Sequence, residues 1–194
     1  MVNAGTKPTE GRRLPPGSHG IPADVVARNQ RERLVAAMAE VCAERGYAQA
    51  SVAEVAKRAG VSSVTFYKQF AGKRECMLAS HRQLLGRLLE AVDKSTEEEG
   101  AEKAGARTVI DTALALFVAD PPSARLLTVE ILAAGSEGVK RHDAMVVAFA
   151  QRLATDWVRA AGVLALVGKL AVAGEAARLP EFEDELVATV SAQS

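Results

Sequence analysis

Apolar side chains recur along the chain with the spacing of α-helices. In residues 23–45 they fall three or four positions apart, as Leu34, Met38 and Val41 do, and this spacing gathers them on one helical face. Gly46 follows, at a position where helices commonly end. No segment of useful length alternates apolar and polar residues as a strand would. The pattern therefore predicts an all-α protein.

Two short helices and a series of longer ones are expected after the first. Ser51 is placed to cap a helix, because Glu54 three positions later completes a capping box, and Gly60 ends this helix. A proline pair after Asp120 marks a junction between two later helices. The predicted ranges beyond Gly60 are 62–70, 72–92, 101–119, 122–134, 137–161, 163–178 and 181–192.

Composition adds a tail and an uneven distribution of charge. Residues 1–23 are rich in proline, glycine, serine and threonine and lack apolar periodicity, which predicts a disordered tail. The whole chain has 24 basic and 24 acidic side chains, yet residues 28–82 hold ten basic and five acidic ones. This net charge of +5, against −6 for residues 83–194, indicates that the first part contacts a polyanion.

Residues 51–70 have the spacing of a helix-turn-helix. Ala56 leaves room for a crossing helix, Gly60 supplies a turn with positive φ, and Val61 and Phe66 fill the space between the two helices. The second of these helices carries hydroxyls, short side chains and one cation at its N-terminal end, which suit close approach to DNA. These residues are Ser62, Ser63, Val64, Thr65, Tyr67 and Lys68.

Residues 24–80 resemble the DNA-binding domain of the TetR (tetracycline-repressor) family of bacterial transcriptional regulators. The matching residues are Gly46-Tyr47, Ser51-Val52, Val55-Ala56, Ala59-Gly60-Val61-Ser62, Thr65-Phe66-Tyr67, Phe70 and Lys73. The chain departs from the usual pattern at Val64, where the family has glycine, and at Gly72 and Arg74. Val64 could meet a thymine methyl group, so this departure concerns base preference.

The resemblance implies roles for particular side chains. Tyr67 would place its hydroxyl on a phosphate, while Lys68 and Thr65 would face the major groove. Ser51 and Lys73 would meet phosphates at helix N-termini, where unpaired N–H groups favour an anion. The alternative is that the aromatic residues are only core and the lysine is only solvated. The predicted DNA contacts are Ser51, Ser62, Ser63, Val64, Thr65, Tyr67, Lys68 and Lys73. Arg12 and Arg13 could add a minor-groove arm, although a solvated tail is the alternative.

The second half is expected to provide dimerisation, because one recognition helix makes too few contacts for specific binding in a genome. The partner expected there is a second copy of the chain. The two copies together would bind a palindromic operator in double-stranded DNA. TetR-like proteins pair their last two helices, and 163–178 and 181–192 are similar to that segment. The alternative is that these apolar stripes close the core of a monomer.

The helices between the two ends are expected to hold a small-molecule effector, as the resemblance implies. The candidate lining residues are Arg107, Phe117, Arg125, Glu130, His142, Met145, Phe149 and Trp157. Ordinary core packing is the alternative for each of them. His81 and His142 are interpreted as core histidines. Cys42 and Cys76 are interpreted as small buried hydrophobes, with a redox role as the alternative.

Three domains follow: a tail at 1–23, a helix-turn-helix domain at 24–72, and a ligand-binding and dimerisation domain at 73–194. The three histidines and two cysteines have no spacing typical of a metal or catalytic cluster. We therefore expect no enzymatic activity, no cofactor and no bound metal. No apolar run reaches the roughly 18 residues of a membrane span, and a cytoplasmic protein is expected. The prediction is a ligand-responsive repressor; the alternatives are a helical enzyme and a scaffold with a non-functional helix-turn-helix.

Overall fold

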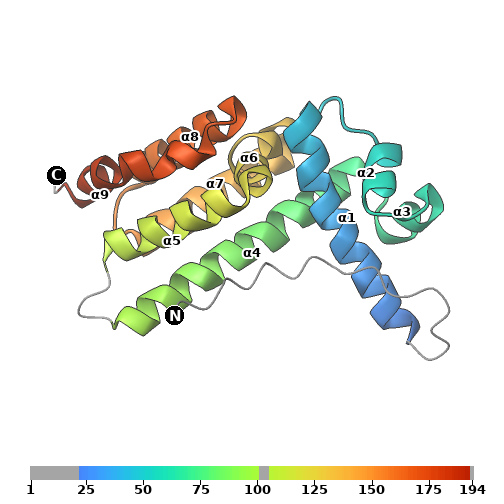
Figure 1. Cartoon of the computed structure of the whole chain (residues 1–194), viewed down its shortest axis with the longest axis horizontal. Helices are drawn as coiled ribbons and strands as arrows, with labels where there is room; N and C mark the ends of the chain where they lie inside the picture. Colours follow the sequence, from blue (N-terminus) through green and yellow to red (C-terminus); the bar gives the residue numbers. More distant parts are fainter. Residues whose placement is uncertain (1–21, 101–104, 193–194) are drawn as a thin grey trace, which may run out of the picture.

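The structure, a computed structural model, describes residues 22–100 and 105–192, and these contain nine α-helices, two 3-10 helices and no strand. This confirms the all-α prediction. Three helices form a head at one end of the molecule and the others form an elongated body (Figure 1). The head is α1 (Ala23–Arg45), α2 (Val52–Arg58) and α3 (Ser63–Gln69). The body is α4 (Lys73–Glu99), α5 (Ala106–Ala119), α6 (Pro121–Thr128), η1 (Glu130–Ala134), α7 (Ser136–Arg152), α8 (Trp157–Ala173), η2 (Ala176–Phe182) and α9 (Glu183–Ser191).

The helix-turn-helix is shaped by local hydrogen bonds that its sequence predicts. The Ser51 hydroxyl accepts the Glu54 N–H, and the Glu54 carboxylate accepts the Ser51 N–H, which completes the capping box of α2. Gly60 ends α2 with a φ of 65°, and the Val61 N–H bonds the Ala56 carbonyl 2.9 Å away. This is the glycine-terminated Schellman geometry, and it turns the chain sharply into α3.

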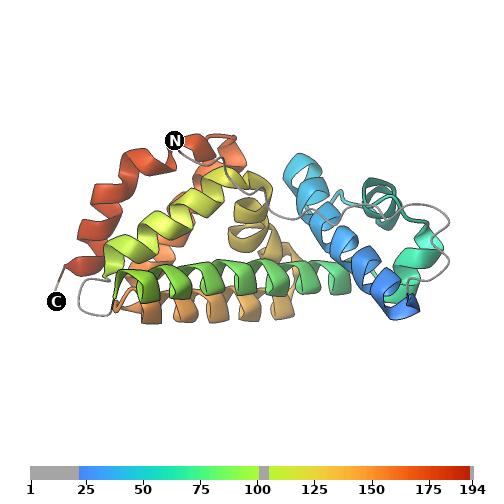
Figure 2. The same ribbon diagram turned by 60° about the horizontal axis from the view of Figure 1, so that its bottom comes forward.

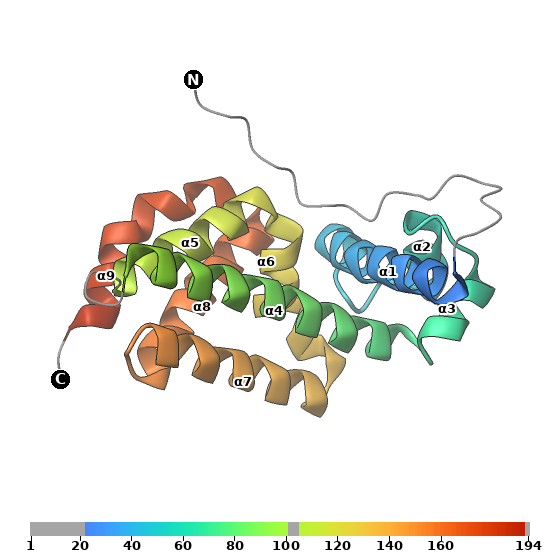
Figure 3. The same cartoon turned by 90° about the horizontal axis from the view of Figure 1, so that it is seen from below.

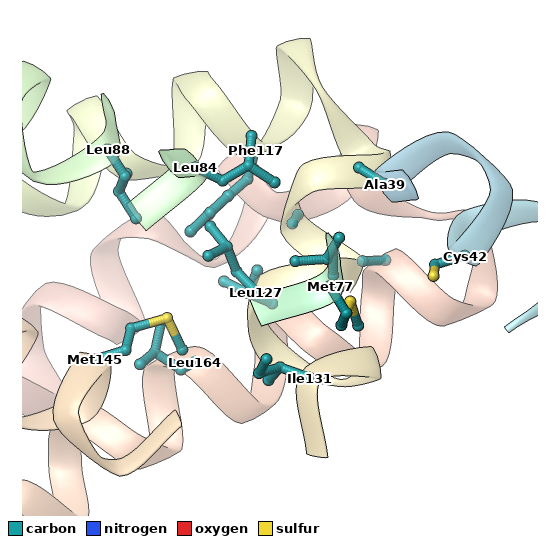
Figure 4. Close-up of a cluster of buried hydrophobic side chains, with 14 of the residues drawn as sticks. Ala39, Cys42, Met77, Leu84, Leu88, Phe117, Leu127, Ile131, Met145 and Leu164 are labelled. Carbon is teal, nitrogen blue, oxygen red and sulfur yellow. The ribbon is translucent and has the colours of Figure 1, made fainter. Parts of the chain in front are cut away.

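The long helix α4 connects the head to the far end of the body (Figure 2). Its N-terminal part packs against α1 and its later turns pack against α5. Helix α7 runs beside α4, as seen from below in Figure 3, and α8 packs against both α6 and α7. Figure 4 shows buried side chains from these elements gathered in one core. They include Met77, Leu84 and Leu88 of α4, Phe117 of α5, Leu127 of α6, Ile131 of η1, Met145 of α7 and Leu164 of α8.

The prediction of a single helix over residues 137–161 is wrong, because the structure has two helices there. Helix α7 ends at Arg152, and Ala154 takes a left-handed conformation with a φ of 49°. Asp156 then caps α8 by accepting the Arg159 N–H at 3.0 Å. The helix predicted over 163–178 also ends earlier than expected, because Gly174 adopts a φ of 74° directly after α8.

The predicted tail and the possible arm at Arg12 and Arg13 lie outside the described residues, except that α1 already begins at Ala23. None of the helices in the described ranges is long and apolar enough to cross a membrane. Cys42 and Cys76 are both fully buried and unbonded to one another, which agrees with their interpretation as small hydrophobes. Burial raises the pKa of each thiol to about 12, so the reactive thiolate is disfavoured.

Candidate DNA-binding surface and effector-binding body

Helix α3 separates its buried and exposed side chains cleanly. Phe66 and Phe70 are buried, and their rings lie 5.7 Å apart between the head helices. Val64 and Tyr67, by contrast, are 67% and 60% exposed. Ser62, Ser63 and Lys68 are exposed as well, and Thr65 is half-buried beside the Ser62 hydroxyl that caps α3. The helix thus presents a polar surface with one protruding apolar side chain.

Two arginines of α1 hold this helix pair in place. Arg31 donates to the Gln69 carbonyl at the end of α3 at 2.8 Å, and its guanidinium lies 4.2 Å from the centre of the Phe70 ring. Arg33 donates to the Gly60 carbonyl in the turn at 3.2 Å. These roles could not be predicted from the sequence, because an arginine on a helix carries no sign of which distant carbonyl it will reach.

The positive charge of the head is therefore less available to DNA than the count suggests. Seven of the ten basic residues between 28 and 82 bind a carboxylate or a carbonyl of the chain itself. They are Arg28, Arg31, Arg33, Arg45, Arg58, Lys73 and Arg74. In the described part of the chain, Lys57, Lys68 and Arg82 have no such partner. Of these three, Lys68 lies on α3 itself.

The structure places Lys73 and Ser51 in internal contacts. The Lys73 ammonium donates to the carbonyls of Tyr47, Ala48 and Ala50 at 3.0–3.1 Å, and it lies 4.7 Å from the centre of the Tyr47 ring. A phosphate contact by Lys73 would have to replace these bonds. The Ser51 hydroxyl is likewise engaged with Glu54 in the capping box.

The predicted effector-binding residues fall into three places. Phe117, Met145 and Phe149 belong to the body core, and Figure 4 shows Phe117 next to Leu84 of α4 and Met145 next to Leu164 of α8. Arg107 lies on the surface, where it pairs with Glu183 and Asp184 of α9. Trp157, at the start of α8, is 48% exposed, and His142 is half-buried. Arg125 and Glu130 lie where the body contacts the head.

His81 is a core histidine, as its place on an apolar stripe predicts, but it lacks the hydrogen bond expected of one. It is 1% exposed on α4, and its Nε2 atom is buried without a hydrogen-bond partner. Burial lowers its pKa to about 4, and Arg141 and His142 on α7 act in the same direction. The ring is therefore neutral at physiological pH, and its unpartnered nitrogen faces the interior.

Helix α8 leaves open one face that carries a single charged residue. Val158 and Val172 are 72% and 48% exposed, and Gly162 and Ala165 between them are exposed too. Lys169 is the single charged residue among the exposed positions of this face. Small and aliphatic side chains in such a row allow another helix to approach closely.

A three-helix head with a tightly turned helix pair and an exposed polar second helix, joined to a helical body, is the architecture of a helix-turn-helix protein. Residues 34–79 match the family model of bacterial regulatory proteins of the tetR family. These residues therefore form a helix-turn-helix domain of the TetR type, and the chain is similar to transcriptional regulators of that family.

Two curated relatives are similar over part of their length. The fatty acid metabolism regulator protein of Bacillus subtilis is 30% identical over 88 residues, which are 45% of either chain. The HTH-type transcriptional activator FasR of Mycolicibacterium smegmatis is 27% identical over 124 residues, 64% of this chain and 57% of that one. The chain thus matches about half the length of these relatives.

Solved structures share the fold over most of the chain. FadR from Bacillus subtilis, in complex with stearoyl-CoA, superposes with a TM-score of 0.66 at 21% identity and covers 84% of this chain and 98% of that one. A transcriptional regulator from Rhodococcus sp. Rha1 superposes with a TM-score of 0.60 at 28% identity, over 82% and 93% of the two chains.

Proposed function

We propose that this regulator is a homodimeric repressor that binds a palindromic operator and is released by a long-chain acyl-CoA. The observation that carries the DNA-binding part is the exposed face of α3, from Ser62 to Lys68, held rigidly on a buried Phe66 and Phe70. A short helix fixed in this way can enter the major groove without rearranging the head.

The exposed residues of α3 have complementary tasks in this proposal. Thr65 and Lys68 face the major groove, where the Lys68 ammonium meets a phosphate at the edge of the groove. The Tyr67 hydroxyl bonds another phosphate, and Val64 contacts a thymine methyl. Ser62 and Ser63 approach the backbone at the start of the helix. We retain Ser51 and Lys73 only as neighbours of a phosphate, because their side chains also hold the turn before α2.

Dimerisation is proposed through α8 and α9. The open face of α8 is uncharged apart from Lys169, and α9 lies beside it at the end of the body (Figure 1). Two heads joined in this way would contact half-sites about 34 Å apart, or a multiple of that distance. The doubled contact area supplies the specificity that a single seven-residue recognition helix lacks.

The acyl-CoA part rests on the relatives and on the character of the body. Similar proteins from Bacillus subtilis and Bacillus halodurans are named as fatty acid regulators, and FadR from Bacillus subtilis was solved with stearoyl-CoA. The core between α4, α5, α7 and α8 is lined by leucine, methionine and phenylalanine, which suits an aliphatic chain. Such a ligand releases DNA only if it binds the operator-incompetent arrangement more tightly.

Selection of genomic fragments with the purified full chain tests this proposal. We expect a palindrome, a dimer by sedimentation, and weaker binding of that duplex when stearoyl-CoA is added, with palmitate and free CoA as controls. If the chain is monomeric and binds no duplex at low ionic strength, the proposal of a dimeric DNA-binding regulator is wrong. If stearoyl-CoA leaves DNA binding unchanged, the proposed effector is wrong. If deletion of the regulator abolishes expression of a reporter gene, the protein is an activator, as FasR is named.

A further inference from the structure

The end of α1 is completed by side chains from the body. The helix stops at Arg45, and Gly46 turns away with a φ of 76°. The Gly46 N–H still bonds the Cys42 carbonyl, and one more helical residue would have joined the Tyr47 N–H to the Ala43 carbonyl, four residues earlier. Instead, the Tyr47 N–H donates to Glu130 Oε2 at 2.6 Å, and the Ala43 carbonyl accepts Arg125 Nη1 at 2.7 Å.

The two body residues are themselves an ion pair. Arg125 Nε and Nη2 each lie 2.8 Å from Glu130 Oε1, and Glu130 is only 8% exposed. A continuous chain of hydrogen bonds thus runs from the Tyr47 N–H through both side chains to the Ala43 carbonyl. The guanidinium also lies at the negative end of the α1 dipole, which favours a cation there. We call this arrangement the Arg125–Glu130 bridge.

The bridge lies next to the segment that orients the helix-turn-helix. Residues 46–50 connect α1 to the Ser51 cap, and Lys73 of α4 donates to three carbonyls of this segment. Arg74 of α4 donates to the Ala134 carbonyl at the end of η1 at 3.1 Å. A displacement of α6 and η1 therefore pulls on α1 and on α4 together.

We infer that the Arg125–Glu130 bridge positions the DNA-binding head, and that its opening is the step by which an effector weakens operator binding. When Arg125 and Glu130 withdraw, the Tyr47 N–H and the Ala43 carbonyl can bond each other, and α1 gains residues at its C-terminus. The change needs Gly46 to move from positive to helical φ, which glycine does at little cost. The positioning role stands alone; the release step rests on the proposed effector response.

The operator affinity of four variants tests the positioning role. They are Arg125→Met, Glu130→Met, the double variant and, as a matched control, Arg152→Met, which removes a bidentate pair with Asp93 inside the body. With the selected duplex in fluorescence anisotropy at fixed salt, we expect an operator Kd about tenfold higher for the three bridge variants. Because the pair acts as one unit, the double variant should bind no more weakly than either single one.

Three readouts separate positioning from a merely structural role. Affinity for a random duplex should stay unchanged in all variants, and Arg152→Met should keep the wild-type operator Kd even where its Tm falls. Amide hydrogen exchange at Tyr47 should accelerate in Glu130→Met, where Arg125 still occupies the Ala43 carbonyl, and should slow again in the double variant, where the two backbone groups can bond each other. Gly46→Ala, which disfavours the positive φ while leaving both bridge side chains in place, should weaken operator binding in the same way; it also serves if the bridge variants do not fold.

Stearoyl-CoA tests the release step. A wild-type response of tenfold or more in operator Kd should shrink to about threefold or less in the double variant, because the bridge is already open. Folded bridge variants, or a folded Gly46→Ala variant, with the wild-type operator Kd overturn the positioning role. A full stearoyl-CoA response in the double variant overturns the release step. If stearoyl-CoA does not change the operator Kd of the wild type, the proposed effector is wrong. The operator Kd values of the variants without ligand still decide whether the bridge positions the head.

Discussion

Ala154 adopts a positive φ although it has a Cβ atom, and it is the only non-glycine residue in the described ranges to do so. The Thr155 N–H bonds the Ala150 carbonyl across it, in the same geometry that Gly60 provides after α2. An L-residue in this conformation is strained by about 1–2 kcal/mol. Ala154→Gly should therefore raise the free energy of unfolding by about 0.5–1 kcal/mol.

Urea unfolding at fixed protein concentration measures this change. The control is Ala144→Gly on the exposed side of α7, where the helix is regular and glycine should cost about 1 kcal/mol. Equal losses in the two variants would show that Ala154 carries no strain.

The buried neutral His81 should make stability depend on pH. Its pKa is about 4 in the folded chain and 6.5 for an ordinary histidine, so between these values the unfolded state binds the extra proton. The free energy of unfolding should consequently fall as pH drops from 6.5 towards 4, by up to about 1.4 kcal/mol per pH unit. The groups facing the ring, Arg141 and His142, both disfavour its protonation.

A comparison of the wild type with His81→Phe isolates this effect, since both share every other titrating group except for small couplings. The difference between their unfolding free energies should change with pH in that window and level off above pH 7. Parallel curves from pH 4 to 7 would refute the assignment.

Helix ends could be predicted from the sequence where they carry the usual capping residues. They could not be predicted where an unusual residue makes the same turn. Ser51 with Glu54, and Gly60, are caps made of the residue types that favour caps, so their positions could be foreseen. Ala154 makes the same kind of turn with a good helix former, and the predicted helix therefore ran on to residue 161.

At the scale of elements, the contact between η1 and α7 depends on the absence of a side chain. A Cβ at Gly138 would lie 2.0 Å from the Ile131 carbonyl oxygen, a backbone atom that cannot simply rotate away. Gly138→Ala should therefore destabilise the protein by about 1–3 kcal/mol.

Gly86 provides the matched comparison, because it lies in α4 and a Cβ at this position would meet no atom within 4 Å. Gly86→Ala should stabilise by about 0.5–1 kcal/mol through helix propensity alone. Thermal unfolding of the two variants should shift Tm in opposite directions, and a shared direction would contradict the close approach of η1 and α7.

At the scale of the whole molecule, most cations of the head serve the fold, so the salt dependence of DNA binding should be modest. Lys68→Gln should weaken operator binding and flatten the slope of log K against log salt by about 0.9 if Lys68 meets one phosphate. Lys94→Gln, on the exposed side of α4 in the body, should change neither. An unchanged slope in Lys68→Gln would place Lys68 away from the backbone of DNA.

The head could be foreseen as a motif, but its attachment to the body could not. Periodicity and caps act over a few residues, and they predicted α1, α2 and α3 nearly as found. Arg125 reaches Ala43 across 82 positions of the chain, and no local pattern encodes such a pairing. The sequence alone therefore indicates only effector contacts for Arg125 and Glu130, a role that stays a prediction, whereas the structure shows both side chains at the C-terminal end of α1.

The completion of α1 by Arg125 and Glu130 limits how regulators of this kind can be recombined. A chimera that grafts residues 23–72 onto the sensory half of another protein brings the Tyr47 N–H and the Ala43 carbonyl without their partners. It also leaves behind Lys73, which holds the following turn. Hybrid biosensors built from this chain should therefore keep α4, α6 and η1 with the transplanted helices, or supply an equivalent arginine and glutamate in the recipient.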